Sequence, residues 1–169
     1  MRLLYHQLVL VLVAAVACGG SDGTTAQRQG LDNSEAVAAT YDLATSTKVK
    51  VYKPTFCGCC ASWVEHMRTA GFEVEVEETD ELERVKSELG VPSELESCHT
   101  AEVEVYVIEG HVPADVIARL LTERPEVRGI AVPGMPAGSP GMETSDGQTE
   151  PFDIVSFDET GQTAVYDSR

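Results

Sequence analysis

The chain has 169 residues, enough for one domain with a hydrophobic core and some additional sequence. It carries 28 acidic side chains against 12 basic ones, for a formal net charge of −16 at pH 7. This charge argues against nucleic acid or an anionic membrane surface as a partner. It favours solubility and the attraction of cations.

The N-terminal residues 1–17 have the pattern of an export signal. Arg2 supplies a positive charge, an apolar run follows over 8–16, and small residues lead to Cys18. The apolar run is too short for a typical membrane-spanning helix. The sequence at Cys18 resembles a bacterial lipobox, in which this cysteine is lipidated. The match is imperfect, because Ala15 stands where leucine is usual. Ordinary signal cleavage is the alternative. Either route predicts an exported protein, in the bacterial periplasm or anchored to a membrane and facing the periplasm.

Residues 18–46 are rich in small and polar side chains and show little apolar periodicity. This composition predicts a lipid-anchor cysteine followed by a flexible tether, with a weak helical pattern over 35–44. We expect any membrane contact to be made only through that anchor. Residues 47–169 are expected to form one folded domain.

The folded part begins with a strand, a helix and a second strand. Residues 48–53 and 72–77 alternate polar and apolar side chains, as strands do. The helix between them is predicted to begin near Cys57 and to end at Gly71. Its apolar face has four side chains at helical spacing: Cys60, Trp63, Val64 and Met67. His66, beside this face, is expected to point to solvent.

The rest of the chain continues the alternation of strands and helices. In chain order we expect a helix capped by Asp80 and stopped by Gly90, a loop with Cys98, a strand over 103–108, a helix over 114–123, a glycine- and proline-rich loop over 129–141, and a hairpin of strands 152–157 and 163–166. This order predicts an α/β fold. The type expected is a thioredoxin-like sandwich, with a central mixed sheet flanked by helices and a C-terminal β-hairpin.

Three thiols are concentrated at the start of the first helix, in Cys57-Gly58-Cys59-Cys60. Unpaired amides and the helix dipole at this end favour the thiolate, which is both nucleophile and metal ligand. Cys57 and Cys60 are three residues apart and can face the same point. Cys59 and Cys60 are adjacent, about 100° apart around a helix, so the three thiolates cannot easily surround one tetrahedral ion. Either Cys59 is a bystander or the thiolates bridge several metal atoms.

Further soft ligands are expected in the loops. Cys98 and His99 supply a thiol and an imidazole that the fold could bring near the helix start. The alternative is a core cysteine beside a surface histidine. His111 follows a predicted strand and is either a ligand or a turn residue. Met135 and Met142 lie in a turn-rich segment without a helix face to fill, so they are either thioether ligands or packing residues. Thiolate, imidazole and thioether together favour Cu(I), with zinc less favoured.

Four motifs follow one another along the chain: Val51–Cys60, Ser97–Ala101, Ile108–Ala114 and Val132–Glu143. Together they resemble the CopG-type periplasmic copper-resistance proteins, a family long catalogued as a domain of unknown function. The resemblance covers about 48–169, and the chain departs from the family at its N-terminal tether and predicted anchor. It implies a thioredoxin-like fold and a cysteine-bridged copper site. The residues that it implies for this site are the thiolates Cys57, Cys59, Cys60 and Cys98, with His111, Met135 and Met142 as neighbours.

The leading function hypothesis is a cell-envelope protein that binds Cu(I) in a thiolate cluster and acts in copper handling or resistance. Copper-efflux or copper-oxidising proteins are its candidate partners. One alternative is a thiol–disulfide oxidoreductase using Cys57 and Cys60, although Cys59 and Cys98 are surplus to a simple cycle. Another is a lipid-anchored interaction module. A metal-binding protein is favoured over an enzyme, and an enzyme would be a thiol or copper oxidoreductase. The sequence shows no Gly-rich phosphate loop, Ser-His-Asp order or recognisable calcium loop.

Overall fold

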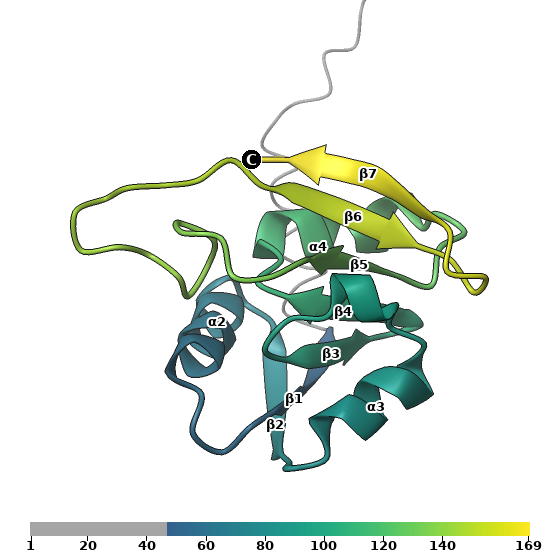
Figure 1. The fold of residues 1–169 in the computed structure, drawn as a ribbon, viewed down its shortest axis with the longest axis horizontal. Coiled ribbons are helices and arrows are strands. Elements are labelled where there is room, and N and C mark those ends of the chain that lie inside the picture. Colours follow the sequence, from purple (N-terminus) through teal and green to yellow (C-terminus); the bar gives the residue numbers. More distant parts are fainter. Residues whose placement is uncertain (1–46) are drawn as a thin grey trace, which may run out of the picture. The chain divides into compact units, whose positions relative to one another are not determined.

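The computed structural model describes residues 47–169 (Figure 1). The predicted export signal, the lipidation site Cys18, the tether and its weak helical segment lie outside the described residues. The described elements, in chain order, are β1 (Lys48–Lys53), α2 (Gly58–Thr69), β2 (Glu73–Glu78), α3 (Leu82–Leu89), the 3₁₀ helix η1 (Ser93–Leu95), β3 (Thr100–Val103), β4 (Tyr106–Gly110), α4 (Ala114–Glu123), β5 (Gly129–Val132), β6 (Asp153–Phe157) and β7 (Thr163–Ser168).

The strands form one mixed, seven-stranded sheet in the order β2-β1-β3-β4-β5-β6-β7. The pairs β1–β2 and β4–β5 are parallel, and each is connected by a helix. The other neighbouring strands are antiparallel, and β6 and β7 form the terminal hairpin. The predicted α/β class, mixed sheet with flanking helices and C-terminal hairpin are confirmed. The thioredoxin-like assignment stays a prediction.

Two hydrophobic clusters cover the two faces of the sheet. The larger contains the apolar residues of α2 and α4, including Trp63 and Met67, and the smaller is formed around Leu95, Val107 and Phe157. Neighbouring residues on β4 and β5 alternate between the clusters, as the two-residue repeat of a strand requires. Helices α2 and α4 therefore lie on one face of the sheet, and η1 lies on the other. Within the described residues, no helix has the length and apolar composition needed to cross a membrane.

Two strand predictions are corrected. The sequence predicts one strand over 103–108, but the chain turns at Glu104, whose φ of 54° is left-handed, and the strands β3 and β4 pair with each other. No Asn-Gly or Asp-Gly pair marks this turn. The predicted loop after 129 begins instead with strand β5, which is buried along its whole length. A strand of four residues that is buried on both faces has no polar–apolar alternation to reveal it.

The helix ends agree better with the sequence. Gly71 and Gly90 have φ values of 98° and 77°, as expected for residues that end a helix in the left-handed conformation. Asp80 is not the cap of α3, because the N-cap is Glu81, which makes no side-chain capping bond. The Glu81 N–H is satisfied instead by Thr79 Oγ1 at 3.0 Å.

Candidate metal centre

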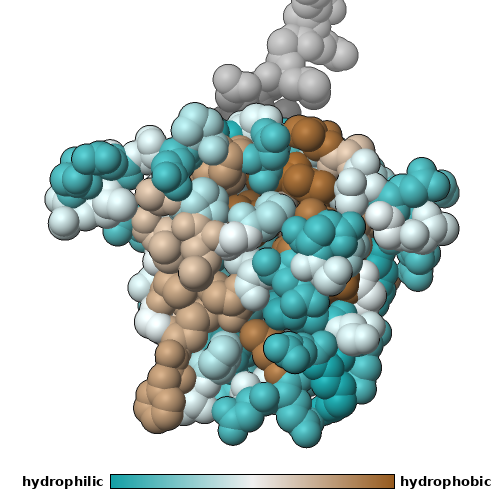
Figure 2. All heavy atoms as spheres, viewed as in Figure 1, coloured by the Kyte–Doolittle hydropathy of each residue, from teal (hydrophilic) through white to brown (hydrophobic). Residues whose placement is uncertain are grey.

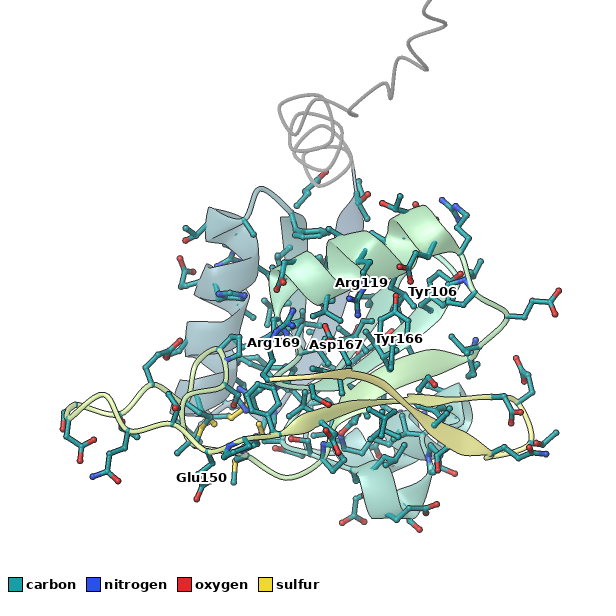
Figure 3. The ribbon with its side chains drawn as sticks, turned by 90° about the horizontal axis from the view of Figure 1, so that it is seen from above. Tyr106, Arg119, Glu150, Tyr166, Asp167 and Arg169 are labelled. Atoms are coloured by element: carbon teal, nitrogen blue, oxygen red, sulfur yellow. A yellow bond between two sulfur atoms is a disulfide. The ribbon has the colours of Figure 1, made fainter. Side chains whose placement is uncertain are left out.

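Four cysteine sulfurs come together between the start of α2 and the loop that precedes β3. The Sγ atoms of Cys57, Cys59, Cys60 and Cys98 all lie within 4.8 Å of one another. Cys57 and Cys60 form a disulfide, whereas Cys59 and Cys98 are free thiols. Cys59 Sγ lies 3.5 Å from Cys57 Sγ and 3.8 Å from Cys98 Sγ. In Figure 3 the sulfur atoms gather at one end of α2, and the disulfide is drawn as a yellow bond.

The backbone at Cys57 explains why the helix begins there. Cys57 is the N-cap, with an extended φ of −123°, and its Sγ accepts the N–H of Cys60 at 3.3 Å. A sulfur in this position sits at the positive end of the helix dipole, which favours a thiolate once the disulfide is reduced. Cys60 is fully buried, and its Sγ lies 3.5 Å from the carbonyl oxygen of Cys98. This contact joins the helix start to the Cys98 loop.

His111 faces the thiol of Cys98. Its Nε2 lies 2.9 Å from Cys98 Sγ, and its Nδ1 lies 2.7 Å from the carbonyl oxygen of Pro140. A carbonyl oxygen only accepts, so Nδ1 carries the proton and donates, which leaves Nε2 of the neutral ring bare. Burial lowers the pKa of His111, which favours this neutral form. Nε2 is thus available to accept the Cys98 proton or to bind a metal.

Cys98 is a protonated thiol in this arrangement. Burial, followed by the neighbouring Cys59, raises the pKa of Cys98 to about 12. The thiol proton can therefore be donated to His111 Nε2 at neutral pH. A bound cation would replace that proton, because thiolates rather than thiols are metal ligands.

His99, which the sequence offers as an imidazole donor but the family resemblance does not include in the site, is a buried neighbour of Cys98. Its side chain is fully buried and lies between Trp63 and His111, with ring centroids 4.5 and 5.0 Å away. Its Nδ1 lies 3.4 Å from Cys98 Sγ, and its Nε2 has no hydrogen-bond partner within residues 47–169. Burial lowers its pKa well below the usual value, so the ring is neutral.

The two imidazoles extend the thiol cluster. Ligand atoms of Cys98, His99 and His111 form a second group whose members lie within 4.8 Å of one another. Cys98 belongs to both groups, so sulfur and nitrogen donors form one continuous set. Adjacency to Cys98 is the one sequence signal that points to His99, and it does not reveal that the ring turns into the core.

The methionine loop, residues 133–142 with Met135 and Met142, is held against this site at both ends. Ser97 Oγ donates to the carbonyl oxygen of Gly134, the residue before Met135. Gly141, the residue before Met142, lies so close to α2 that a Cβ there would be 2.7 Å from the Cys59 carbonyl oxygen. The contact of Pro140 with His111 is next to it. Met135 is 52% exposed and Met142 is half-buried, and their role as ligands stays a prediction.

Helix α2 also holds the segment that follows His111. Trp63 Nε1 donates to the carbonyl oxygen of Val112 at 2.8 Å, and the N–H of Ala114 donates to His66 Nε2 at 3.1 Å. The prediction that His66 points to solvent is therefore wrong, because the ring is half-buried and accepts the first N–H of α4. Helix α2 and its N-cap thus carry three cysteines, and the helix also fixes the chain next to the histidine ligand candidate.

The surface near the cysteines is apolar. Figure 2 shows a band of moderately hydrophobic side chains over α2 and the loop before it. That loop includes Phe56, which is fully exposed and directly precedes Cys57. The thiols thus lie beside an apolar part of the surface, although the chain as a whole is strongly acidic.

Comparisons with known proteins give a consistent result. A family model described as "Protein of unknown function, DUF411" matches residues 95–142, the segment that contains Cys98, His111 and both loop methionines. A solved structure named "Copper resistance protein copG- Form 2" is 40% identical, with a TM-score of 0.69, and the match covers 73% of this chain and 98% of that chain. A second, named "Copper resistance protein copG- Form 1", is also 40% identical, with a TM-score of 0.68 and coverages of 72% and 96%. A search of the curated proteins gave no match.

The agreement extends over nearly the full length of both solved proteins, at an identity that exceeds what a shared fold alone requires. The four motifs noted in the sequence lie in the described part of the chain. The chain belongs to the CopG family of copper resistance proteins.

Proposed function

We propose that this protein binds Cu(I) through its reduced thiolate cluster and acts in copper handling or resistance in the cell envelope. The observation that carries the proposal is the continuous set of four cysteine sulfurs and two imidazole nitrogens, in two overlapping groups with separations of at most 4.8 Å. Thiolates and imidazoles are the donors that soft copper prefers. The names of the two solved relatives support copper as the metal.

The spacing of the sulfurs fits metal ions shared between them. Two sulfurs that each lie about 2.3 Å from one metal ion are at most roughly 4.6 Å apart. The separations from Cys59 to Cys57 and to Cys98, 3.5 and 3.8 Å, are within this limit. Cys59 therefore lies between two possible sulfur partners. This position supports Cys59 as a bridging ligand in a polynuclear site, rather than as a bystander.

Binding requires reduction first. Cys57 and Cys60 share a disulfide bond, and an external dithiol reductant, itself oxidised to a disulfide, must supply the two electrons and two protons that convert it to two thiols. Only then can copper replace the thiol protons of all four clustered cysteines. His111 Nε2 needs no such change, because its neutral ring already presents the bare nitrogen. His99 presents its free Nε2 in the core and its Nδ1 towards Cys98.

Anaerobic titration of the reduced protein with Cu(I), against a chromophoric Cu(I) chelator, tests the proposal. We expect more than one equivalent of copper to bind the wild type. The double variant Cys57→Ser/Cys98→Ser should lose most of this binding. As a matched control, Ser62→Ala changes an exposed hydroxyl on the same helix and should leave binding unchanged. Binding of less than one equivalent by the wild type would rule the proposal out.

A thiol–disulfide oxidoreductase is the second candidate, and the Cys57–Cys60 disulfide at a helix N-terminus favours it. Cys59 Sγ, 3.5 Å from Cys57 Sγ, is close enough to attack that bond. An insulin-reduction assay on the metal-free protein separates the two functions. Turnover that survives Cys98→Ser but not Cys57→Ser would favour the oxidoreductase.

The cell-envelope location is part of the proposal and rests on the sequence of residues 1–18. We infer that membrane contact is made only through a lipid on Cys18, and that copper-efflux or copper-oxidising proteins are the partners. Fractionation of cells that express the wild type or Cys18→Ala tests the anchor. Release of the variant from the membrane fraction is expected, whereas an unchanged distribution would favour ordinary signal cleavage or another mode of retention.

A further inference from the structure

A buried ionic cluster lies beneath the loop that carries Cys98. Lys86 of α3 and Glu109 of β4 form an ion pair, with 3% and 0% of their side chains exposed. Lys86 Nζ also donates to Thr100 Oγ1 at 2.9 Å, and Thr100 Oγ1 donates to Glu109 Oε2 at 2.6 Å. Charged side chains are seldom buried so completely. None of these three residues is a ligand in the proposed copper site.

The cluster is connected directly to the metal centre through the backbone. The N–H of Ser97, the residue before Cys98, donates to Glu109 Oε1 at 2.5 Å. Two residues after Glu109, on the same strand end, His111 faces Cys98 Sγ. The Glu109 carboxylate therefore joins the segment that carries the thiol to the segment that carries the imidazole.

Close packing around this link leaves little freedom. A Cβ on Gly110 would lie only 2.6 Å from the Ser97 side chain and 2.6 Å from the Val132 carbonyl oxygen. The N–H of Gly110 donates to the carbonyl oxygen of His99 at 3.0 Å. The segments around Ser97 and Gly110 are thus held at a fixed separation, and the Glu109 carboxylate supplies the acceptor between them.

Stability alone does not account for a buried ion pair. The cost of removing two charges from water often cancels their attraction, and apolar residues of similar volume can replace such pairs without loss of stability. An apolar side chain at position 109 would, however, leave the N–H of the half-buried Ser97 without this acceptor. A carboxylate can accept from Lys86, Thr100 and Ser97 at once, because its two oxygens offer about four acceptor sites.

We propose that Glu109 is a positioning residue for the metal centre, whose carboxylate holds the Ser97–Cys98 backbone so that Cys98 Sγ faces His111 Nε2. Lys86 keeps this carboxylate in place and balances its charge. The expected change in Cu(I) affinity rests on the proposed function. The expected changes in Cys98 alkylation and in the His111 tautomer are measured in the metal-free protein and do not. The two can therefore be measured separately.

Two double variants isolate the acceptor from the charges. Lys86→Met/Glu109→Met removes both charges and the acceptor for Ser97 at nearly constant volume. Lys86→Met/Glu109→Gln also removes both charges but keeps a carbonyl oxygen at position 109 that can accept the Ser97 N–H. Arg119→Met/Asp167→Asn removes a 3.0 Å ion pair between α4 and β7 and serves as the control (Figure 3).

The readout in the reduced, metal-free protein is the rate at which iodoacetamide alkylates Cys98, followed by peptide mass spectrometry. The tautomer of His111 is read from its imidazole ¹⁵N shifts. We expect several-fold faster alkylation and a loss of the Nδ1-protonated tautomer in Lys86→Met/Glu109→Met. The glutamine variant and the Arg119 control should remain close to wild type. If the methionine variant does not fold, Thr100→Val replaces it as the test. This variant keeps both charges but loses the hydroxyl that donates to Glu109 Oε2, so with a native circular dichroism spectrum its Cys98 should be alkylated faster than in the wild type.

Copper binding gives the dependent readout. Cu(I) affinity of Lys86→Met/Glu109→Met should fall about 10- to 100-fold, the usual cost of losing a residue that orients a ligand. If the wild type binds no copper, the proposed function fails, and the alkylation and tautomer results still decide the role of Glu109. Equal alkylation rates and the same tautomer in wild type and both double variants would overturn the positioning role. Equal changes of the alkylation rate in the methionine and glutamine double variants would also overturn it, because loss of the charges or general destabilisation would then be the cause.

Discussion

His111 Nε2 lies 2.9 Å from Cys98 Sγ, and this contact connects the end of β4 to the cysteine loop. The other ring nitrogen is occupied by its hydrogen bond to the Pro140 carbonyl oxygen. The ring is therefore fixed in the tautomer that presents a bare nitrogen to the thiol. In this orientation the ring nitrogen and the cysteine sulfur could both bind one metal ion without a change of tautomer.

Replacement of His111 should weaken copper binding without destroying the thiol cluster. In His111→Gln, the bare imidazole nitrogen is lost, while the sequence that carries the four cysteines is unchanged. We expect Cu(I) affinity to fall by at least about tenfold, a typical effect of disturbing the surroundings of a metal site. Competition with a chromophoric chelator measures it, and Ser62→Ala, which changes an exposed hydroxyl of α2, is the control. An affinity equal to that of the wild type would remove His111 from the site.

Gly141 should be sensitive to a single added methyl group. Its φ is 85°, and a Cβ would lie 2.7 Å from the Cys59 carbonyl oxygen and 2.8 Å from the Trp63 N atom. Gly141→Ala should therefore push the methionine loop away from α2. Gly147→Ala is the control, because Gly147 has a similar φ of 71° but nothing within 4 Å.

Both alanine variants should lose about 1 kcal/mol from backbone strain. Gly141→Ala should lose more, and its Cu(I) affinity should also fall because the neighbouring Pro140 orients His111. Urea unfolding and copper titration check the two effects. Equal losses of unfolding free energy in the two variants would contradict this prediction, because they would mean that the loop accommodates the added methyl group at Gly141 without cost.

The metal-free protein should become less stable as the pH falls below about 6.5, the ordinary pKa of histidine. Burial lowers the pKa values of His66, His99 and His111 in the folded state. The unfolded chain therefore binds more protons below pH 6.5, and folding stability decreases as the pH falls towards the folded-state values. Above pH 6.5 this contribution is complete.

His66 provides the test of this pH dependence, because protonation of its Nε2 would break the bond from the Ala114 N–H. Urea unfolding of the reduced protein at several pH values between 7.5 and 5 measures it. In His66→Gln the slope of stability against pH should be smaller than in the wild type. A wild-type stability that does not change with pH over this range would contradict the burial of neutral histidines.

Several parts of the fold and site could be predicted from the sequence because they depend on local signals. Gly71 and Gly90 mark helix ends through their left-handed conformations, which other residues seldom adopt. The concentration of thiols at the start of α2 could also be predicted, because the cysteines are adjacent in sequence. Strand β5 could not, because a short segment that is buried on both faces has no periodicity.

The remainder of the site depends on contacts between distant residues. A lysine in a helix and a glutamate in a strand are normally expected on solvated surfaces. Nothing local distinguishes Lys86 and Glu109 from the many exposed charges of this acidic chain. The same holds for His99, whose burial against Trp63 follows from the packing of α2 on the sheet. Sequence motifs thus identify the candidate ligands, and tertiary packing determines how they are oriented.

The proposed function requires the clustered cysteines, with imidazole support, to hold Cu(I). X-ray absorption at the copper edge, on reduced protein loaded with Cu(I) without air, identifies the ligand atoms. We predict a shell dominated by sulfur at about 2.3 Å, the usual length of a metal–thiolate bond. In Cys59→Ser the sulfur contribution should decrease, because the thiol between Cys57 and Cys98 is lost. A shell of nitrogen or oxygen without sulfur in the wild type would show that the cysteines do not hold the copper.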